Sequence, residues 1–176
     1  WQTIPVKGIG YIQSVDDAAI LRLAREHKTI VRMEGGIGEF AIEGTPLASL
    51  ALESPPAEEL ITALQAAFSL SRYRTLQQDS AFGIRQIVDM ALRALSPGTN
   101  DTTTAIVCVD YLTAILARLA SRDIPSSYRY EEGELRVIAI GQSFASLVAD
   151  AFDQIRVSGS DNVAILLRML HGLEII

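Results

Sequence analysis

At 176 residues the chain is long enough to bury a sizeable core, either as one domain or as a small lobe beside a larger one. Its net charge of −6 and its scattered basic residues argue against a nucleic-acid partner, which requires clustered lysine and arginine to neutralise phosphates. One cysteine excludes an intrachain disulfide, and two histidines show no spacing typical of a metal site or a catalytic triad. Neither a metal nor another cofactor is therefore expected.

Residues 1–53 predict a small α/β lobe, with a β-α-β unit followed by a β-hairpin. Strand-forming residues at 8–15 and 29–33 flank DDAAILRLAREH, whose acidic start and basic end suit the helix dipole. Glycines and a proline then mark the turns of the hairpin. Gly36 and Gly38 form a G-x-G pair, but no helix begins after them, so the pair indicates a turn and not a phosphate loop.

The sequence Ser54–Pro55–Pro56 marks the boundary to a second domain, residues 54–176, predicted to be helical with one strand near 134–140. Its helices are expected at about 56–70, 80–95, 102–121, 142–158 and 162–173. The charged stretch SSYRYEEGE before the strand is interpreted as a mobile connection. The predicted apolar face of the last helix consists of Val163, Leu166, Leu167 and Leu170. The fold class is therefore α+β, mainly a helical bundle around a central helical hairpin, with the N-terminal lobe and a late strand.

The helix expected at 102–121 is apolar almost all round. Residues such as Ile106, Val107 and Val109 cannot be gathered onto one face. A helix of this kind lies at the centre of a bundle or is shared between subunits. Apolar residues make up 49% of the chain and charged residues only 20%, so we expect the apolar excess to lie in an interface, on a surface near a membrane or in an unusually complete core. Together with the all-round apolar helix, this composition favours a homo-oligomer.

The segment ALSPGTNDTTT, residues 94–104, predicts a sharp turn between two helices. Pro97 blocks continuation of the first helix, and Gly98 is free to adopt a positive φ at its C-terminus. Asn100 or Asp101 then accepts hydrogen bonds from the unpaired N–H groups of the second helix.

An aspartate on the second helix of this hairpin needs a partner, because an unpaired buried carboxylate is destabilising. Counting along the antiparallel hairpin places Asp110 within roughly one turn, ~5 Å, of Arg85. An Asp110–Arg85 ion pair is therefore predicted. Arg85, Asp89 and Arg93 also follow one another at i, i+4 and i+8, which is typical of a solvated stripe of alternating charge.

The same region supports an alternative interpretation as a site for a small anion or as a hydrolase centre built on the 96–104 loop. The hydroxyl groups and the N-terminus of the following helix favour anion binding, whereas Asp101 disfavours it. No carboxylate pair converges within one helix, and Ser96 has no histidine nearby in the sequence. The candidate polar residues are Arg74, Arg85, Asp89, Ser96, Asn100, Asp101, Thr103 and Asp110. No catalytic residue is assigned, and the pattern favours a protein that is not an enzyme.

Residues 74–105, RTLQQDSAFGIRQIVDMALRALSPGTNDTTTA, resemble the signature of a bacterial family of predicted membrane proteins, domain-of-unknown-function family 2254. That signature is close to R-T-x-x-Q-D-x-x-F-G-I-R-Q-L-V-D-I-A-x-x-A-L-S-P-G-x-N-D-P-x-T-A. The segments GYIQSVD, GEFAIEGTPLA and AFDQIR also resemble the family, so the likeness covers nearly the whole chain. One departure is Thr102, where the family usually has proline, a residue that suits a first helical turn.

The resemblance implies that transmembrane helices precede this region in the parent protein. The chain is then the soluble domain of a bacterial inner-membrane protein, and its partner is the transmembrane part of that protein. Its abrupt ends fit an excised piece. No family activity transfers to these residues, so the expected function is a soluble, non-enzymatic assembly or sensing module.

Overall fold

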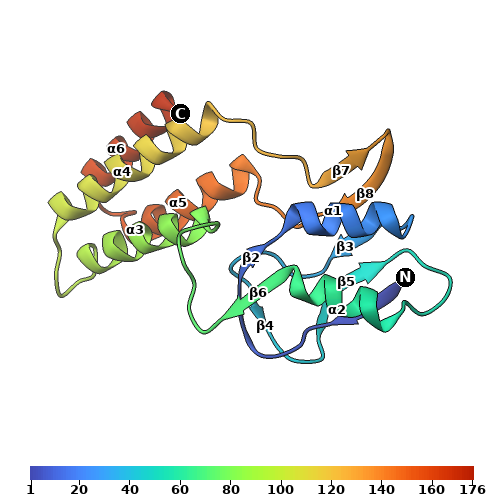
Figure 1. Ribbon diagram of the computed structural model, residues 1–176. Helices are drawn as coiled ribbons and strands as arrows, with labels where there is room; N and C mark the ends of the chain where they lie inside the picture. Colours follow the sequence, from blue (N-terminus) through green and yellow to red (C-terminus); the bar gives the residue numbers. More distant parts are fainter. The chain divides into compact units, whose positions relative to one another are not determined.

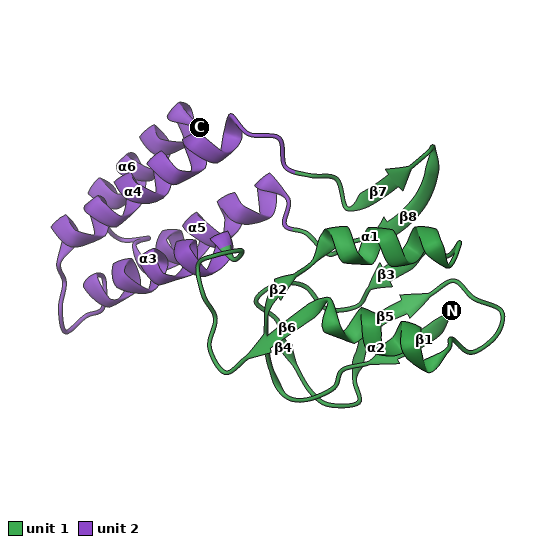
Figure 2. Ribbon diagram, viewed as in Figure 1, with its two compact units in different colours: residues 1–79, 125–141 green, residues 80–124, 142–176 purple.

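The computed structural model describes residues 1–176. Helices and mainly antiparallel β-sheets are both present, which confirms the predicted α+β class (Figure 1). The chain divides into two compact units (Figure 2). Unit 1 comprises residues 1–79 and 125–141, and unit 2 comprises residues 80–124 and 142–176. The expected boundary at residue 54 falls inside unit 1, because the segment after it packs on the N-terminal core.

The elements of unit 1 are β1 (Gln2–Pro5), β2 (Gly10–Val15), α1 (Asp17–Glu26), β3 (Val31–Met33), β4 (Phe40–Ala41), β5 (Pro46–Leu50), α2 (Glu58–Ala66), β6 (Phe68–Ser71), β7 (Tyr128–Glu131) and β8 (Glu134–Ile138). They form a five-stranded sheet in the order β1-β5-β3-β8-β7 and a three-stranded sheet in the order β4-β2-β6. All paired strands are antiparallel except β3 and β8.

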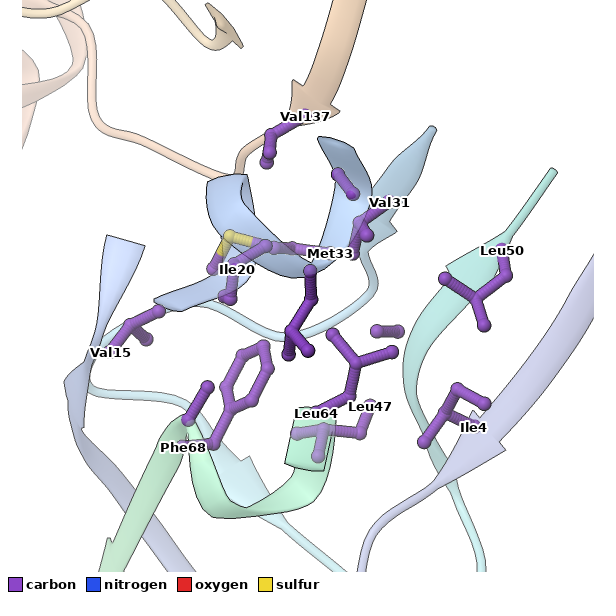
Figure 3. Packing of buried hydrophobic residues seen from close by; sticks show 14 of the residues in the cluster. Ile4, Val15, Ile20, Val31, Met33, Leu47, Leu50, Leu64, Phe68 and Val137 are labelled. Atoms are coloured by element: carbon purple, nitrogen blue, oxygen red, sulfur yellow. The ribbon is translucent and has the colours of Figure 1, made fainter. Parts of the chain in front are cut away.

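The core of unit 1 gathers side chains from both sheets and both helices. In Figure 3, Leu64 of α2 and Phe68 of β6 point into the same apolar cluster as Val31 of β3. The helix predicted at 56–70 therefore ends early, at Ala66, and the chain continues as β6 beside β2. Burial of Phe68 against the sheet outweighs the helical pattern of the sequence, since tertiary packing overrides local propensity.

The stretch interpreted as a mobile connection forms β7, the turn that follows it and the first residue of β8. Glu132 and Gly133 join the two strands, and both have positive φ, at 52° and 80°. Positive φ at both central residues is the geometry of a two-residue type I′ hairpin turn. The strand β8 then pairs in parallel with β3, so a segment more than 90 residues further along the chain completes the N-terminal sheet.

Unit 2 is a bundle of α3 (Ser80–Ala94), α4 (Thr102–Ala120), α5 (Phe144–Ser158) and α6 (Val163–Ile175). Helix α4 packs against the three other helices and is the centre of the bundle, as its sequence predicts. Its buried side chains are Ala105, Cys108, Val109, Leu112, Thr113 and Leu116. The opposite side of α4 is exposed and includes Val107 and Tyr111.

Helix α4 is the one helix in the structure that is long and apolar enough to cross a membrane, by length and composition only. The central helix of a soluble bundle passes the same test.

Helix α6 uses a different face from the one predicted. Ile165, Met169 and Gly172 are buried, whereas Val163 and Leu167 of the predicted face are exposed. The prediction was wrong because the helix is apolar on two sides, and a hydrophobic pattern alone cannot say which side meets the bundle.

The turn between α3 and α4 also differs in one residue from the prediction. Asn100, and not Gly98, adopts the left-handed conformation, with φ 46°. Asparagine tolerates this conformation better than most residues. Its N–H donates to the carbonyl of Ser96 at 2.9 Å, and the N–H of Asp101 donates to the carbonyl of Ala94 at 2.8 Å. The second bond satisfies a carbonyl group left unpaired at the end of α3, and the first closes the turn that follows it.

We expect replacement of Leu112 by alanine to destabilise unit 2 by about 2–5 kcal/mol, because Leu112 is 0% exposed and its truncation leaves a cavity in the core of the bundle. Val107 lies on the same helix but is 45% exposed, so Val107→Ala should change stability by about 0.5 kcal/mol or less. Urea unfolding followed by circular dichroism measures both changes. Equal losses in the two variants would contradict the observed orientation of α4.

Candidate functional site

The signature region begins in unit 1 with an ion pair that sequence analysis did not predict. The Arg74 guanidinium donates from Nε to Asp79 Oδ2 at 2.8 Å and from Nη2 to Asp79 Oδ1 at 3.0 Å. The Asp79 side chain is only 5% exposed. Two parallel bonds from the arginine fork to one carboxylate are stronger and more directional than a single contact. Arg74, expected as an anion ligand, is thus engaged by a carboxylate of its own unit.

A glycine turn lies directly against this pair. Gly38 has φ +87°, and a Cβ atom there would come within 2.6 Å of both Arg74 Nη2 and Asp79 Oδ2. Its N–H donates to the carbonyl of Ile12 at 2.8 Å, which fixes the turn on β2. The G-x-G pair is therefore a turn, as predicted, and its second glycine leaves the room that the ion pair occupies.

Two further hydrogen bonds fix residues 73–79, which we call the anchor segment, to β2. The side-chain oxygen of Gln78 accepts from the N–H of Val15 at 3.1 Å. The side-chain amide of Gln13 donates to the carbonyl of Tyr73 at 3.5 Å. The arginine, glutamine and aspartate of the R-T-x-x-Q-D sequence are therefore all used to hold this segment in place immediately before α3.

On α3 the predicted charged stripe is present. Arg85 Nη2 lies 2.8 Å from Asp89 Oδ1, and both side chains are more than 40% exposed. An exposed i, i+4 pair contributes only a few tenths of a kcal/mol. Arg93 is exposed on the last turn of the same helix, where a positive charge suits the helix dipole.

The polar residues of the 96–104 loop mainly close the two helix ends. Ser96 Oγ donates to the carbonyl of Arg93 at 2.7 Å and lies 3.2 Å from Thr99 Oγ1. Asp101 is the N-cap of α4: Oδ1 accepts from the N–H of Thr104 at 3.0 Å, and Oδ2 accepts from its hydroxyl at 2.5 Å. The bond from the Thr104 hydroxyl is the main cause of a lowered Asp101 pKa. Thr103 is exposed on the first turn of α4.

The predicted Asp110–Arg85 ion pair is wrong, because Asp110 is paired with Arg168 of α6 through both carboxylate oxygens. This hydrogen bonding raises the Arg168 pKa above its ordinary value. Counting residues along the hairpin gives the position of Asp110 along the axis of α4 but not the side of the helix from which it projects. The Asp110 side chain projects towards α6. Near the start of α6, Asn162 Nδ2 also donates to Thr102 Oγ1 at 2.8 Å, so α4 and α6 run in the same direction.

The candidate residues therefore do not form one cluster. Arg74 belongs to unit 1, whereas the others belong to unit 2 and are divided among α3, the loop and the α4–α6 contact. The loop borders an open hollow lined by Asp89, Leu92, Arg93, Ser96 and Thr99. This hollow suits an anion poorly, because it combines one carboxylate with the negative end of the α3 dipole.

Other chemical groups are equally dispersed. No group of three or more histidine, cysteine, aspartate or glutamate side chains lies close enough to hold a metal ion. Cys108 is buried, and burial raises the pKa of its thiol, which disfavours the reactive thiolate. His171 lies 3.7 Å from Glu174 on the exposed side of α6.

A polar cluster on the five-stranded sheet was missed by sequence analysis. Ser49 Oγ donates to Glu34 Oε1 at 2.5 Å, and Arg32 Nε donates to the same oxygen at 2.8 Å. Both bonds lower the pKa of Glu34, and the bond from Ser49 has the larger effect. Trp1 lies over the Arg32 guanidinium at 4.6 Å. The alternation of side chains along β3 predicts that Arg32 points to the face of the sheet opposite to that of the buried Val31 and Met33. Its neighbour Ser49 lies on β5, and only the fold shows that β5 pairs with β3.

Comparison with known proteins identifies the same family that the sequence resembles. The model of a family described as "Predicted membrane protein (DUF2254)" matches residues 1–174. Uncharacterized proteins of Mycobacterium bovis and Mycobacterium tuberculosis are each 35% identical over 170 residues, which is 94% of this chain and 33% of each relative. No solved structure matches the chain.

The chain therefore belongs to this family of predicted membrane proteins. It spans about a third of the length of the curated relatives that it matches. Those relatives are themselves described as uncharacterized, so they assign no activity to the anchor segment or to the loop.

Replacement of Arg74 by alanine should destabilise unit 1 by about 3 kcal/mol, because it removes the guanidinium from a buried carboxylate. The matched control is Arg85→Ala, which removes the same group from an exposed carboxylate and should change stability by about 0.5 kcal/mol or less. Guanidinium unfolding followed by circular dichroism, which reports both units, measures the difference. A similar loss in both variants would show that the buried pair has no special role.

We expect Gly38→Ala to be more destabilising than Gly44→Ala by about 1–3 kcal/mol. Both glycines have positive φ, 87° and 82°, so alanine introduces comparable backbone strain at the two positions. Only at Gly38 does the new methyl group also meet the Arg74–Asp79 pair, since nothing lies within 4 Å of a Cβ at Gly44. Thermal unfolding of the two variants tests the expectation, and equal melting temperatures would contradict it.

Proposed function

We propose that this chain is a soluble, non-enzymatic module of a bacterial integral membrane protein of the inner membrane, and that it assembles subunits or senses on behalf of the membrane part. Its membership of a family of predicted membrane proteins and its coverage of only a third of its relatives support the link to a membrane.

One observation carries the non-enzymatic half of the proposal: the polar side chains of the signature are used to hold the fold. Arg74 is forked to Asp79, Asp101 caps α4, and the Ser96 hydroxyl bonds to the end of α3. A catalytic centre needs an acid, base or nucleophile directed at a common point where substrate binds. These groups point instead at their own backbone and at one another.

The polar contacts of α4 support a place outside the bilayer. Its N-terminus is capped by Asp101, and its flank is joined to α6 through Thr102 and through the Asp110–Arg168 ion pair. Both side chains of that ion pair are about 40% exposed. Ionised groups at such exposure favour water over a hydrocarbon environment, where charged side chains are rare.

The alternative function, a small-anion site or hydrolase centre at the 96–104 loop, has weaker support. The hydroxyls of Ser96 and Thr104 are already hydrogen-bonded within the loop, and Asp101 adds a negative charge. Arg93 is the only cationic side chain in the adjoining hollow, where Asp89 opposes it.

We expect the chain, expressed alone in bacteria, to remain in the supernatant after ultracentrifugation without detergent. Multi-angle light scattering of the purified chain should then give a mass that rises above the monomer value as concentration increases. Recovery only from the membrane pellet would contradict the soluble part of the proposal. A strict monomer at every concentration would contradict the assembly part.

A further inference from the structure

Helix α6 has two apolar faces, and the bundle covers only one of them. Ile165, Met169 and Gly172 pack inward, with Gly172 directly against Thr113 of α4. On the other side Val163 is 67% exposed, Leu167 61%, Leu170 59% and Leu173 47%. We call these four residues the α6 stripe. A continuous row of exposed large apolar side chains on a surface helix marks an interaction surface.

The geometry points to a second copy of this chain as the occupant: we propose that the α6 stripes of two copies pack against each other, antiparallel, about a two-fold axis. The proposal rests on the assembly role proposed above and names the surface that performs it. A two-fold interface brings the same patch of each subunit together, so the patch must be complementary to itself.

The spacing of the stripe fits another helix. Val163, Leu167 and Leu170 follow one another at intervals of four and three residues. This spacing, 3.5 residues on average, gives the seam along which two helices interlock their side chains. A helix partner therefore fits the stripe better than a flat surface does.

The charge at the end of the stripe selects the antiparallel orientation. The next position in the same spacing is Glu174, whose side chain is 80% exposed. When Leu167 of one copy lies opposite Leu170 of the other, Glu174 lies opposite the partner's Val163, at the N-terminal end of that helix. The N-terminus carries the positive end of the helix dipole, so a carboxylate is stabilised there. A parallel pair would instead place the two Glu174 carboxylates side by side.

A lipid surface matches the stripe less well. Helices that lie in a membrane interface carry rows of lysine and arginine on their polar side, which attract anionic headgroups. On α6 the one arginine is Arg168, which is bound to Asp110 of α4. The stripe continues into a glutamate, and the whole chain carries a charge of −6.

The stripe is short, because a helix of 13 residues is about 20 Å long. A strip of that length and about 10 Å wide covers roughly 200 Å², well below the roughly 800 Å² that each partner contributes to a standard stable interface. Free copies should therefore associate weakly. Copies held in one membrane by their parent proteins would associate more strongly, since tethering raises the effective concentration.

Sedimentation velocity over a range of concentrations tests the proposal directly. The double variant Leu167→Asp/Leu170→Asp should raise the dimer dissociation constant at least ~30-fold, with unchanged circular dichroism, because buried aspartates oppose each other across the axis. The control is Val157→Asp on α5, which is equally exposed and lies outside the stripe, and which should associate like the unmodified chain. Glu174→Lys should weaken association, because it reverses the charge placed at the partner's helix N-terminus.

Disulfide trapping tests the orientation without altering the charge of the stripe. In a Cys108→Ala background, mixing Leu167→Cys with Leu170→Cys chains should give mainly mixed disulfides. Disulfides between two Leu167→Cys chains, formed in preference to mixed ones, would indicate a parallel pair and overturn the antiparallel arrangement.

The remaining outcomes separate this inference from the function on which it rests. An unmodified chain that stays monomeric at all concentrations overturns this inference and the assembly part of the proposed function. Association that the double variant leaves intact overturns the α6 stripe and leaves the assembly role standing. Flotation of a monomeric chain with phosphatidylglycerol–phosphatidylethanolamine vesicles, lost in the double variant, would make the stripe a lipid-binding surface and overturn the second copy as its occupant.

Discussion

The fork between Arg74 and Asp79 is the interaction on which the structure around the signature depends. A carboxylate that is only 5% exposed requires a cation in contact with it, and the arginine fork supplies one through two hydrogen bonds. The pair fits only because Gly38 has no side chain. These three residues, together with the hydrogen bonds of Gln13 and Gln78, hold the anchor segment against β2.

Unit 2 shows how an apolar sequence is distributed over a small bundle. Helix α4 buries one side in the centre and is joined to α6 at its flank by polar contacts. Helix α6, at the outside, has more apolar surface than its neighbours can cover. The high apolar content of the chain is thus not absorbed wholly by the two cores, and part of it lies on the surface of α6.

The polar loop between α3 and α4 has a structural explanation that accounts for most of its composition. Two helix ends meet within a few residues, and each leaves backbone groups that need partners. The Asp101 carboxylate and Thr104 serve the start of α4, while the Ser96 hydroxyl and the Asp101 N–H serve the end of α3. A loop rich in serine, threonine, asparagine and aspartate is therefore weak evidence for catalysis where it joins two helices.

The sequence by itself determined the α+β class, the four helices of unit 2, a polar cap for α4 at Asn100 or Asp101, and the family. These follow from periodicity, capping and motif spacing, all of which act over a few residues. Only the tertiary structure decided the partner of Asp110, the buried face of α6 and the return of β7 and β8 to the N-terminal sheet. Each of these depends on segments more than 50 residues apart. A helix that is apolar on two sides, or a strand at a sheet edge, is compatible with several neighbours, and packing of the whole chain selects one.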